Sequence, residues 1–454
     1  MSGAPRAALR ASLLGALLLL CGCPQEIRAL EPDGGTAPAD GGPAGPDAGL
    51  PPVVTCPTSG PSLSCAVDGP AALLPVESIV SVRCTLDGRG RAARYLEARV
   101  SPPALVGVQD RLGVDGTVLV QVQKRKLGLA FRDTQLAVDV LARHSDDERS
   151  CASARVTFTV AGNLWVTDPA AGVVRAFASD GTLLGDALPP MGEPRAIASL
   201  PDGVLIGGAQ SPGGPTELVK LGFEGALLAT FTRKLGAEDV LANRLPHSAV
   251  LSGDGFLYVS LGVGDQSGRL LKYAPDGQSV SEITLPAGRS PRGLAALPGG
   301  GLAVGLLNGN GAFLRLDAGG TNAREIVPAW RDSASTSDCK PNATFGVALL
   351  GTGGLWISAR DPGSWGLAGL EATLKPGSFA FDRYSPHTHA TSDKGALFND
   401  PHDWLVELSS GVYVAGGFGS PVIDVLDPGS FGARSPPVTL GGYSGSPRGM
   451  VRLK

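Results

Sequence analysis

The sequence predicts an all-β protein, and three observations lead to this prediction. A glycine followed by alternating large apolar residues occurs six times, at intervals of roughly 41 to 57 residues. The chain contains Gly 65 and Pro 37, which favours frequent turns and short strands. Most copies also follow a second apolar run, as in PRAIASLPDG from Pro194, so the repeat unit contains a hairpin. Repeats of this length are typical of propeller blades. We therefore predict a six-bladed β-propeller over residues 161–454, preceded by a small β-sandwich domain.

The N-terminal residues 1–23 have the composition of a secretory signal. Arg6 and Arg10 precede an apolar run that is too short to span a membrane comfortably, and Leu20-Cys21-Gly22-Cys23 follows it. This motif resembles the lipobox of bacterial lipoproteins, whose final cysteine is diacylated and becomes the mature N-terminus. The resemblance implies a lipidated Cys23, a bacterial cell envelope location, an outer membrane in particular, and the membrane as a partner through the lipid anchor. The alternative is an ordinary cleaved signal.

Residues 24–52 contain almost no large apolar side chain. Their centre reads PDGGTAPADGGPAGPDAG, which cannot offset its ordering entropy by burial. We predict a disordered tether here, rich in Pro, Gly and Asp, which separates the folded part from the membrane.

Residues 53–160 alternate with period two between turn-prone breaks. The segments SIVSVRCTLDG, RYLEARVSP, TVLVQVQK, LAVDVLAR and ARVTFTV belong to about seven short strands, a number that suggests a β-sandwich. The region resembles a bacterial immunoglobulin-like module, although the usual tryptophan is absent. A spacer between tether and propeller and an adhesion or partner-binding module are both compatible with this pattern.

Four cysteines fall in this region, namely Cys56, Cys65, Cys84 and Cys151. Disulfides persist in exported proteins, so two bridges are expected, and three connectivities are available. We favour a bridge between Cys84 and Cys151 that joins the two sheets. Cys339 is left over as a free or intermolecular thiol.

The first copy of the repeat carries a more specific signature. GNLWVTD is followed by VVRAFASDG, in which Val174, Arg175, Phe177, Asp180 and Gly181 match the pattern of NHL repeats. The region therefore resembles NHL-type propellers and the related streptogramin-lyase and gluconolactonase propellers. Later copies depart from the pattern, since Asp168 is replaced by Ala209, Leu261, Leu307, Arg360 and Gly417. The resemblance implies the fold more than an activity.

The two ends of the repeat region predict how the ring closes. The first copy lacks its preceding Pro-Arg strand, whereas SPRGMVRLK supplies such a strand with no copy after it. We predict that Met450 to Leu453 pairs beside Leu164 to Thr167 and leaves no open edge. The alternative is a tight hairpin between ARVTFTV and GNLWVTD.

A candidate binding site follows from the register of the repeats. In five units one residue at the start of the apolar run lies eight or nine residues before the next repeat's glycine, and Arg448 in the last run is the sixth. In the propellers that the sequence resembles, this strand is innermost, so these residues would meet at one mouth of the central channel. Arginine donors suit carboxylate, phosphate or sulfate groups, although pairing with acids such as Glu193 is the alternative. The six residues are Arg195, His247, Arg292, Phe345, His402 and Arg448.

A second cluster lies in YSPHTHATSDKGALFNDPHDW, where His387, His389 and His402 are near one another in sequence. His-x-His places two imidazoles on one face of an extended chain, so a divalent metal is the one cofactor for which this sequence offers ligands. The alternative is a polar loop, because the spacing matches no closed zinc pattern.

The sequence contains no recognisable catalytic motif and favours a binding function. A net charge of -4, with no sustained basic run, excludes nucleic acid as an expected partner. The leading interpretation is a surface-anchored lipoprotein whose propeller is a binding or scaffold module for a protein, a glycan or an anionic ligand. The alternative is a lyase or lactonase that acts in the channel.

Overall fold

A computed structural model of the chain shows that its regular structure consists of antiparallel β-sheets. Apart from two short 3-10 turns at Pro298–Gly300 and Ala318–Gly320, every regular element among the described residues is a strand. None of the described helices is long and apolar enough to span a bilayer. The structure describes residues 63–67, 79–86, 91–92, 95–101, 106–109, 117–122, 128–143, 151–178, 182–263, 266–309, 312–326, 343–349, 355–361, 364–366, 370–375, 378–384, 402–408, 411–416, 422–426, 438–439 and 447–454. The predicted signal, tether and Cys23 lie outside these residues.

Two sheets form from the strands that precede the propeller. On β2 the buried Val82 and Cys84 alternate with the exposed Arg83 and Thr85, as a half-buried strand requires, whereas Leu136, Ala137 and Val138 on β7 are all at most 1% exposed. Arg155 donates to Asp139 at 2.6 Å across a directly opposed pair in the second sheet. The first sheet joins β1 (Leu63–Val67), β2 (Ile79–Leu86), β6 (Thr117–Val122) and β5 (Val106–Gln109), with β3 (Arg91–Ala92) on β2, and the second joins β4 (Tyr95–Ser101), β7 (Thr134–Arg143) and β8 (Cys151–Val160).

The disulfide in this region differs from the predicted pair. Cys84 bonds to Cys65 and not to Cys151. Cys65 on β1 lies directly opposite Cys84 on β2, with their Cα atoms 4.1 Å apart, so the bridge lies within one sheet instead of joining two. Period-two alternation shows which residues share a face, but it does not show which strands are neighbours. Cys56 and Cys339 lie outside the described residues.

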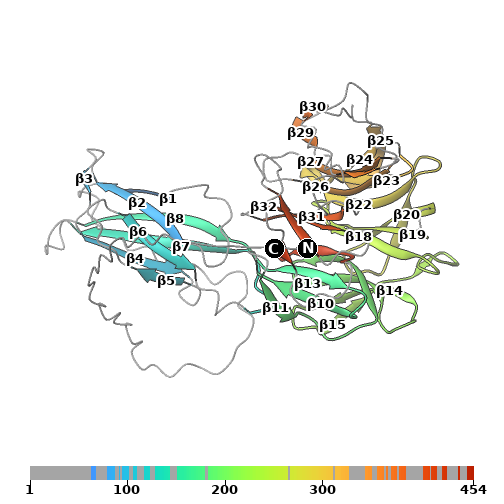
Figure 1. The fold of residues 1–454 in the computed structure, drawn as a ribbon, viewed down its shortest axis with the longest axis horizontal. Coiled ribbons are helices and arrows are strands. Elements are labelled where there is room, and N and C mark those ends of the chain that lie inside the picture. Colours follow the sequence, from blue (N-terminus) through green and yellow to red (C-terminus); the bar gives the residue numbers. More distant parts are fainter. Residues whose placement is uncertain are drawn as a thin grey trace, which may run out of the picture. The chain divides into compact units, whose positions relative to one another are not determined.

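Each of the six glycine-led repeats has its own antiparallel sheet (Figure 1). In each sheet the strand that carries the repeat is second from one edge. The edge strand carries the apolar run that precedes the repeat, or, in the first sheet, the apolar run at the end of the chain. The sheets are β35 (Met450–Arg452), β9 (Leu164–Asp168), β10 (Val173–Phe177) and β11 (Leu183–Asp186); β12 (Glu193–Leu200), β13 (Gly203–Ala209), β14 (Thr216–Leu221) and β15 (Leu227–Thr230); β18 (Leu245–Leu251), β19 (Leu257–Val263), β20 (Gln266–Tyr273) and β21 (Val280–Ile283); β22 (Ser290–Ala296), β23 (Leu302–Leu307), β24 (Phe313–Asp317) and β25 (Thr321–Ile326); β26 (Ala343–Leu349), β27 (Leu355–Asp361) and β28 (Ser364–Gly366); and β31 (His402–Leu408), β32 (Gly411–Gly416), β33 (Val422–Leu426) and β34 (Val438–Thr439). Two further hairpins pair β16 (Lys234–Leu235) with β17 (Glu238–Asp239) and β29 (Leu370–Lys375) with β30 (Ser378–Tyr384).

The C-terminal strand closes the ring as predicted. Met450 on β35 pairs with Val166 on β9, and Arg452 pairs with Leu164. The alternative hairpin does not form, because β8 pairs with β7 in the earlier sheet. In Figure 1 the red C-terminal segment accordingly lies beside the green sheets that begin the propeller.

The hydrophobic core lies between neighbouring sheets. One cluster combines Leu205 and Leu218 from the second sheet of the ring with Val259 and Leu271 from the third, and all four side chains are fully buried. The second strand of a blade packs against both neighbouring sheets, so both of its faces are apolar, which explains the nearly continuous burial of β9, β13 and β23. Two of the repeat glycines are required by close backbone contact. A Cβ at Gly203 would lie 2.0 Å from the Leu221 carbonyl oxygen, and a Cβ at Gly162 would lie 2.2 Å from the Leu453 carbonyl oxygen.

Candidate functional site

Each inner strand begins with a β-bulge, and the bulge positions carry the candidate ligand-binding residues. The pairing of β12 with β13 shifts register at Arg195, and the pairing of β18 with β19 shifts at His247. The shift in β22 includes Arg292. Just before β35, the Thr167 N–H donates to the Gly449 carbonyl oxygen, and the Thr167 carbonyl oxygen accepts from the Arg448 N–H. Two residues thus oppose one, which is the arrangement of a bulge. A bulge re-aims the side chain at the start of the strand, so these residues occupy equivalent places around the ring.

The structure places Arg292 in contact with the His247 imidazole, and the charges of Arg195 and Arg448 act on the same imidazole. Arg292 Nη1 lies 2.7 Å from Nδ1 and 2.8 Å from Nε2 of His247, so either tautomer offers it an acceptor. Burial, followed by the charges of Arg292, Arg195 and Arg448, holds the pKa of His247 well below its ordinary value. His247 is therefore neutral at pH 7, and the positive charge of the cluster resides on the three guanidinium groups.

Arg195 also has an acidic partner on its own strand. Its Nη2 lies 3.1 Å from Glu193 Oε2, and the Glu193 side chain is 45% exposed. The pairing that the sequence left open as an alternative is therefore present at this arginine. A half-exposed ion pair of this kind is weak, so Glu193 partly offsets the positive charge of Arg195 but does not hold its side chain in one position.

The fifth position of the ring, His402, differs from the prediction. His402 pairs with Gly416, which aligns His402 with Pro194 and Pro246 instead of with the bulge residues. The register shift falls at Asp403, so Asp403 occupies the bulge of β31. The spacing in the sequence did not decide between the two residues, since Asp403 is eight residues before Gly411, as Arg195 is before Gly203, whereas His402 is nine before it, as Arg292 is before Gly301. The side chains of Phe345, which lies on β26, and of His402 are outside the described residues.

Hydroxyl groups that sequence reasoning missed connect neighbouring sheets beneath the bulges. Thr167 Oγ1 donates to the Arg195 carbonyl oxygen at 2.8 Å, and Ser260 Oγ donates to the Arg292 carbonyl oxygen at 2.5 Å. Both hydroxyls come from the second strand of one sheet and hold the bulge residue of the next. Thr167 and Ser260 are fully buried, so these hydrogen bonds hold the backbones of Arg195 and Arg292 in place from the interior of the protein.

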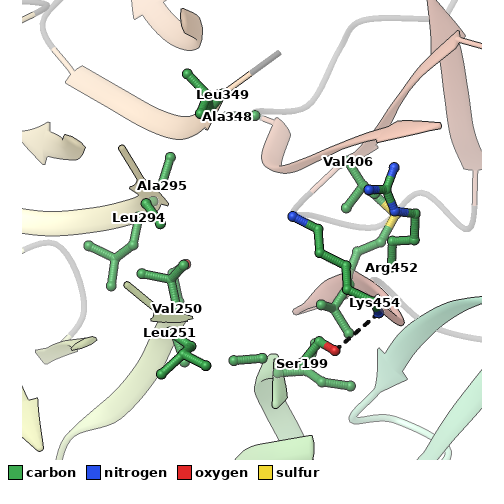
Figure 2. A pocket seen from close by; sticks show the side chains of 18 of the residues that line it. Ser199, Val250, Leu251, Leu294, Ala295, Ala348, Leu349, Val406, Arg452 and Lys454 are labelled. Carbon is green, nitrogen blue, oxygen red and sulfur yellow. Dashed lines mark hydrogen bonds between the residues drawn. The ribbon is translucent and has the colours of Figure 1, made fainter. Parts of the chain in front are cut away.

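A cavity of about 720 Å³ lies between the inner strands, below the bulge residues. We call it the channel cavity. Figure 2 shows aliphatic side chains from several strands around it, with Val250 and Leu294 on one side and Lys454 reaching into the opening from the other. His247 and Arg292 are not among its described lining residues, although Ser248 and Gly293, which directly follow them, are. Arg195 and Arg448 are likewise absent from the described lining. The described lining residues are 197–201, 248–251, 293–296, 347–349, 406, 450–452 and 454.

The described residues contain no group of three His, Cys, Asp or Glu side chains placed to hold a metal. His387 and His389 lie outside the described residues, and of His402 only the backbone is described. The divalent metal therefore stays a prediction from the sequence.

Comparisons with known proteins identify no family for this chain, so its fold is assigned from its own strand pairing. No family model matches the sequence, and no curated protein matches it. A nidogen/laminin complex chain is 13% identical over 64% of this chain and 98% of its own, with a TM-score of 0.44. Virginiamycin B lyase from Staphylococcus aureus is 13% identical over 71% of this chain and 96% of its own, with a TM-score of 0.37. An aldose sugar dehydrogenase from Streptomyces coelicolor is 17% identical over 59% of this chain and 86% of its own, with a TM-score of 0.37.

The sheets define the class of protein. The chain is an all-β protein of the propeller type, because successive sheets follow the repeats and the last strand completes the first sheet. The bulges at the start of its inner strands gather three arginines around one neutral histidine.

Proposed function

We propose that this protein is a lipid-anchored binding protein of the bacterial cell envelope, whose six-bladed propeller binds an anionic ligand at the cationic cluster. The cluster consists of Arg195, His247, Arg292 and Arg448. The observation that carries the proposal is the contact between Arg292 and His247, with Arg195 and Arg448 close enough to lower the pKa of the same imidazole. Three guanidinium groups in one region produce a positive potential that attracts an anionic ligand.

The ligand class follows from the donors. Arginine presents paired N–H groups that match carboxylate, phosphate and sulfate oxygens. The residues of the cluster belong to consecutive sheets, from β35 through β12 and β18 to β22, so the donors form a continuous arc. The other two bulge positions hold Phe345 and Asp403. An anionic glycan, or an acidic group on a protein surface, would place its charge on the arc.

Removal of one guanidinium tests the binding site. Arg292→Ala removes a charge-assisted hydrogen bond worth about 1.5 to 3 kcal/mol, so affinity for an acidic ligand should fall roughly ten- to a hundredfold. Calorimetry with glucose 6-phosphate, N-acetylglucosamine 6-sulfate and galacturonic acid measures the change, with glucose as the neutral control ligand. Arg315→Ala is the matched control protein, because Arg315 lies on β24, away from the inner strands. Equal affinity of the wild type and Arg292→Ala for every acidic sugar would contradict the proposal.

The alternative function, a lyase or lactonase, is supported by one observation. A neutral imidazole beside a guanidinium group, as in His247 and Arg292, can accept a proton next to a developing negative charge. Consumption of an acidic probe by the wild type, but not by His247→Asn, would favour catalysis over binding.

The lipid anchor is a separate prediction. Residues 20–23 predict cleavage before Cys23 and acylation of its thiol, and the tether of residues 24–52 would then hold the propeller away from the membrane. The intact mass of protein extracted from membranes should equal that of a chain that begins at Cys23 and carries its acyl groups. Cys23→Ala should release the protein into the soluble fraction. A mature N-terminus at another residue would rule out this anchor.

A further inference from the structure

The segment that leads into β7 bonds to the propeller at the place where the ring closes. We call this segment, residues 128–133, the strap. The Asn163 N–H, in the first repeat, donates to the Phe131 carbonyl oxygen at 2.8 Å. The Asp133 N–H donates to the Leu453 carbonyl oxygen, next to the end of the chain, at 3.0 Å. The main chain of the strap is therefore bonded to both sides of the closure.

Two buried side chains of the first repeat also donate to the strap. Asn163 Nδ2 lies 2.9 Å from the carbonyl oxygens of both Gly128 and Leu129, and Trp165 Nε1 lies 2.9 Å from that of Leu129. Asn163 and Trp165 are both 0% exposed. Movement of the strap away from the ring would remove the acceptors of these donors, which is costly for buried polar groups.

The sequence of the first repeat differs from the others at the residue that meets the strap. Asn163 directly follows the repeat glycine, and the other five repeats have an apolar residue at this position. These residues are Val204, Phe256, Leu302, Leu355 and Val412. A buried amide needs hydrogen-bond partners, and the strap supplies two acceptors for it. The first repeat is therefore adapted to the strap.

Asp133 joins the beginning of the first repeat to the closing strand. Its Oδ1 accepts the Gly162 N–H at 2.8 Å, and its Oδ2 lies 3.2 Å from Arg452 Nη2. The side chains of Asp133 and Arg452 are 18% and 15% exposed, so solvent screens this ion pair only in part. The segments cross closely, since a Cβ at Gly162 would lie 2.7 Å from the Asp133 nitrogen. One carboxylate thus holds both sides of the closure.

Arg132 extends the contacts of the strap to the second sheet of the ring. Its Nη1 donates to the Pro201 carbonyl oxygen at 3.0 Å, and its guanidinium lies 5.0 Å from the centre of the Phe223 ring. Pro201 lies between β12 and β13, and Phe223 follows β14. Arg132 is exposed, so these contacts contribute less than those of the buried donors.

We propose that the strap holds β35 on β9, so that closure of the propeller depends on a segment that precedes the propeller in the chain. The pairing of β35 with β9 covers only three residue pairs, so the bonds from the strap to Gly162, Arg452 and Leu453 are a large addition to it. This gives residues 53–160 a role besides those of a spacer or a binding module. The role does not depend on any ligand of the cationic cluster.

Hydrogen exchange of the full chain, followed by mass spectrometry, measures how often the closing strand opens. Asp133→Ala removes the charge-assisted bonds to Gly162 and Arg452. Exchange in residues 448–454 should become about ten- to a hundredfold faster in this variant, because such bonds shift an opening equilibrium by about that factor. Exchange in β22 and β23, on another sheet, should not change.

The matched control is Asp239→Ala. Asp239 resembles Asp133 in its contacts, since its Oδ2 lies 2.7 Å from Arg233 Nη2 and its Oδ1 accepts the Leu241 N–H at 3.1 Å. It lies on β17, which is not part of the ring closure. Asp239→Ala should therefore leave exchange in residues 448–454 as in the wild type.

Two further variants serve if Asp133→Ala does not fold. Asp133→Asn keeps an oxygen for the Gly162 N–H but removes the charge beside Arg452, so it should accelerate the same exchange by a smaller factor. Asn163→Leu introduces the residue that the fourth repeat has at this position, and it removes two donors to the strap. It should accelerate exchange in residues 128–134 and 448–454 together. Melting temperatures verify that each variant is folded.

The pattern of exchange decides the proposal. Faster exchange confined to residues 128–134 would show that the strap detaches without loosening the closing strand, and it would overturn the proposal. An equal increase in every segment of the chain would also overturn it, because the variants would then lower the stability of the whole fold instead of opening the closure.

Discussion

A chain that ends before Ser446 should unfold at a temperature at least 10 °C lower than the full chain. The deletion removes β35, so β9 loses its hydrogen-bonded inner partner and becomes the innermost strand of its sheet. It also removes Met450 and Leu453, which are 6% and 0% exposed. Burial of two such side chains stabilises by about 1.5 to 3 kcal/mol each, a large share of ordinary domain stability. Calorimetric or circular dichroism melting would measure the shift.

The controls for this deletion separate ring closure from the loss of individual contacts. Leu453→Ala keeps every backbone hydrogen bond of the closing strand and should cost only about 2 to 5 kcal/mol. Addition of the peptide SPRGMVRLK to the truncated protein should restore part of the lost stability in a concentration-dependent way. A truncated protein that melts together with the full chain would show that the closing strand does not hold the ring.

The fold was predictable because its pattern is local and repeated. Six copies of a glycine-led alternation predict six equivalent strands, and the strand missing at the start matches the extra strand at the end. The pairing of Met450 with Val166 confirms this inference. The disulfide was not predictable, since Cys65, Cys84 and Cys151 all lie on strands, and the choice depends on which strands are neighbours.

The site was predictable only to within one residue. A count of eight or nine residues before each glycine allowed both His402 and Asp403, and hydrogen-bond register alone shows that the bulge falls at Asp403. The channel cavity had no signal in the sequence, because its lining residues are mostly aliphatic and spread over six strands. Their partial exposure appears only when the strands surround a common space.

The buried position of His247 makes the stability of the protein dependent on pH. Its pKa in the folded protein lies well below its ordinary value, because burial and three arginine charges oppose protonation. In the unfolded chain the imidazole has an ordinary pKa of about 6.5. As pH falls below this value, the unfolded chain takes up a proton that the folded protein does not, so stability decreases until the folded pKa is reached.

The charged groups that act on His247 are Arg292, Arg195 and Arg448, with Glu193 paired to Arg195. The pKa values of Glu238 and Asp239 are lowered mainly by hydrogen bonds from Arg269 and Arg233, respectively, so their contribution is lost only in more acidic solution. The chain contains four further histidines, so the effect of His247 is the difference between the wild type and a variant that lacks this imidazole.

The free energy of unfolding of the wild type should fall by at most about 2 kcal/mol between pH 7 and pH 5 through His247 alone, because each pH unit below 6.5 costs at most about 1.36 kcal/mol per proton. His247→Asn keeps a polar group beside Arg292 and removes the titration, so its stability should fall by less over the same interval. Urea denaturation at half-unit steps of pH would give both slopes. Parallel slopes in the two proteins would show that His247 titrates normally in the fold, and the cationic cluster would then be too open to act on it.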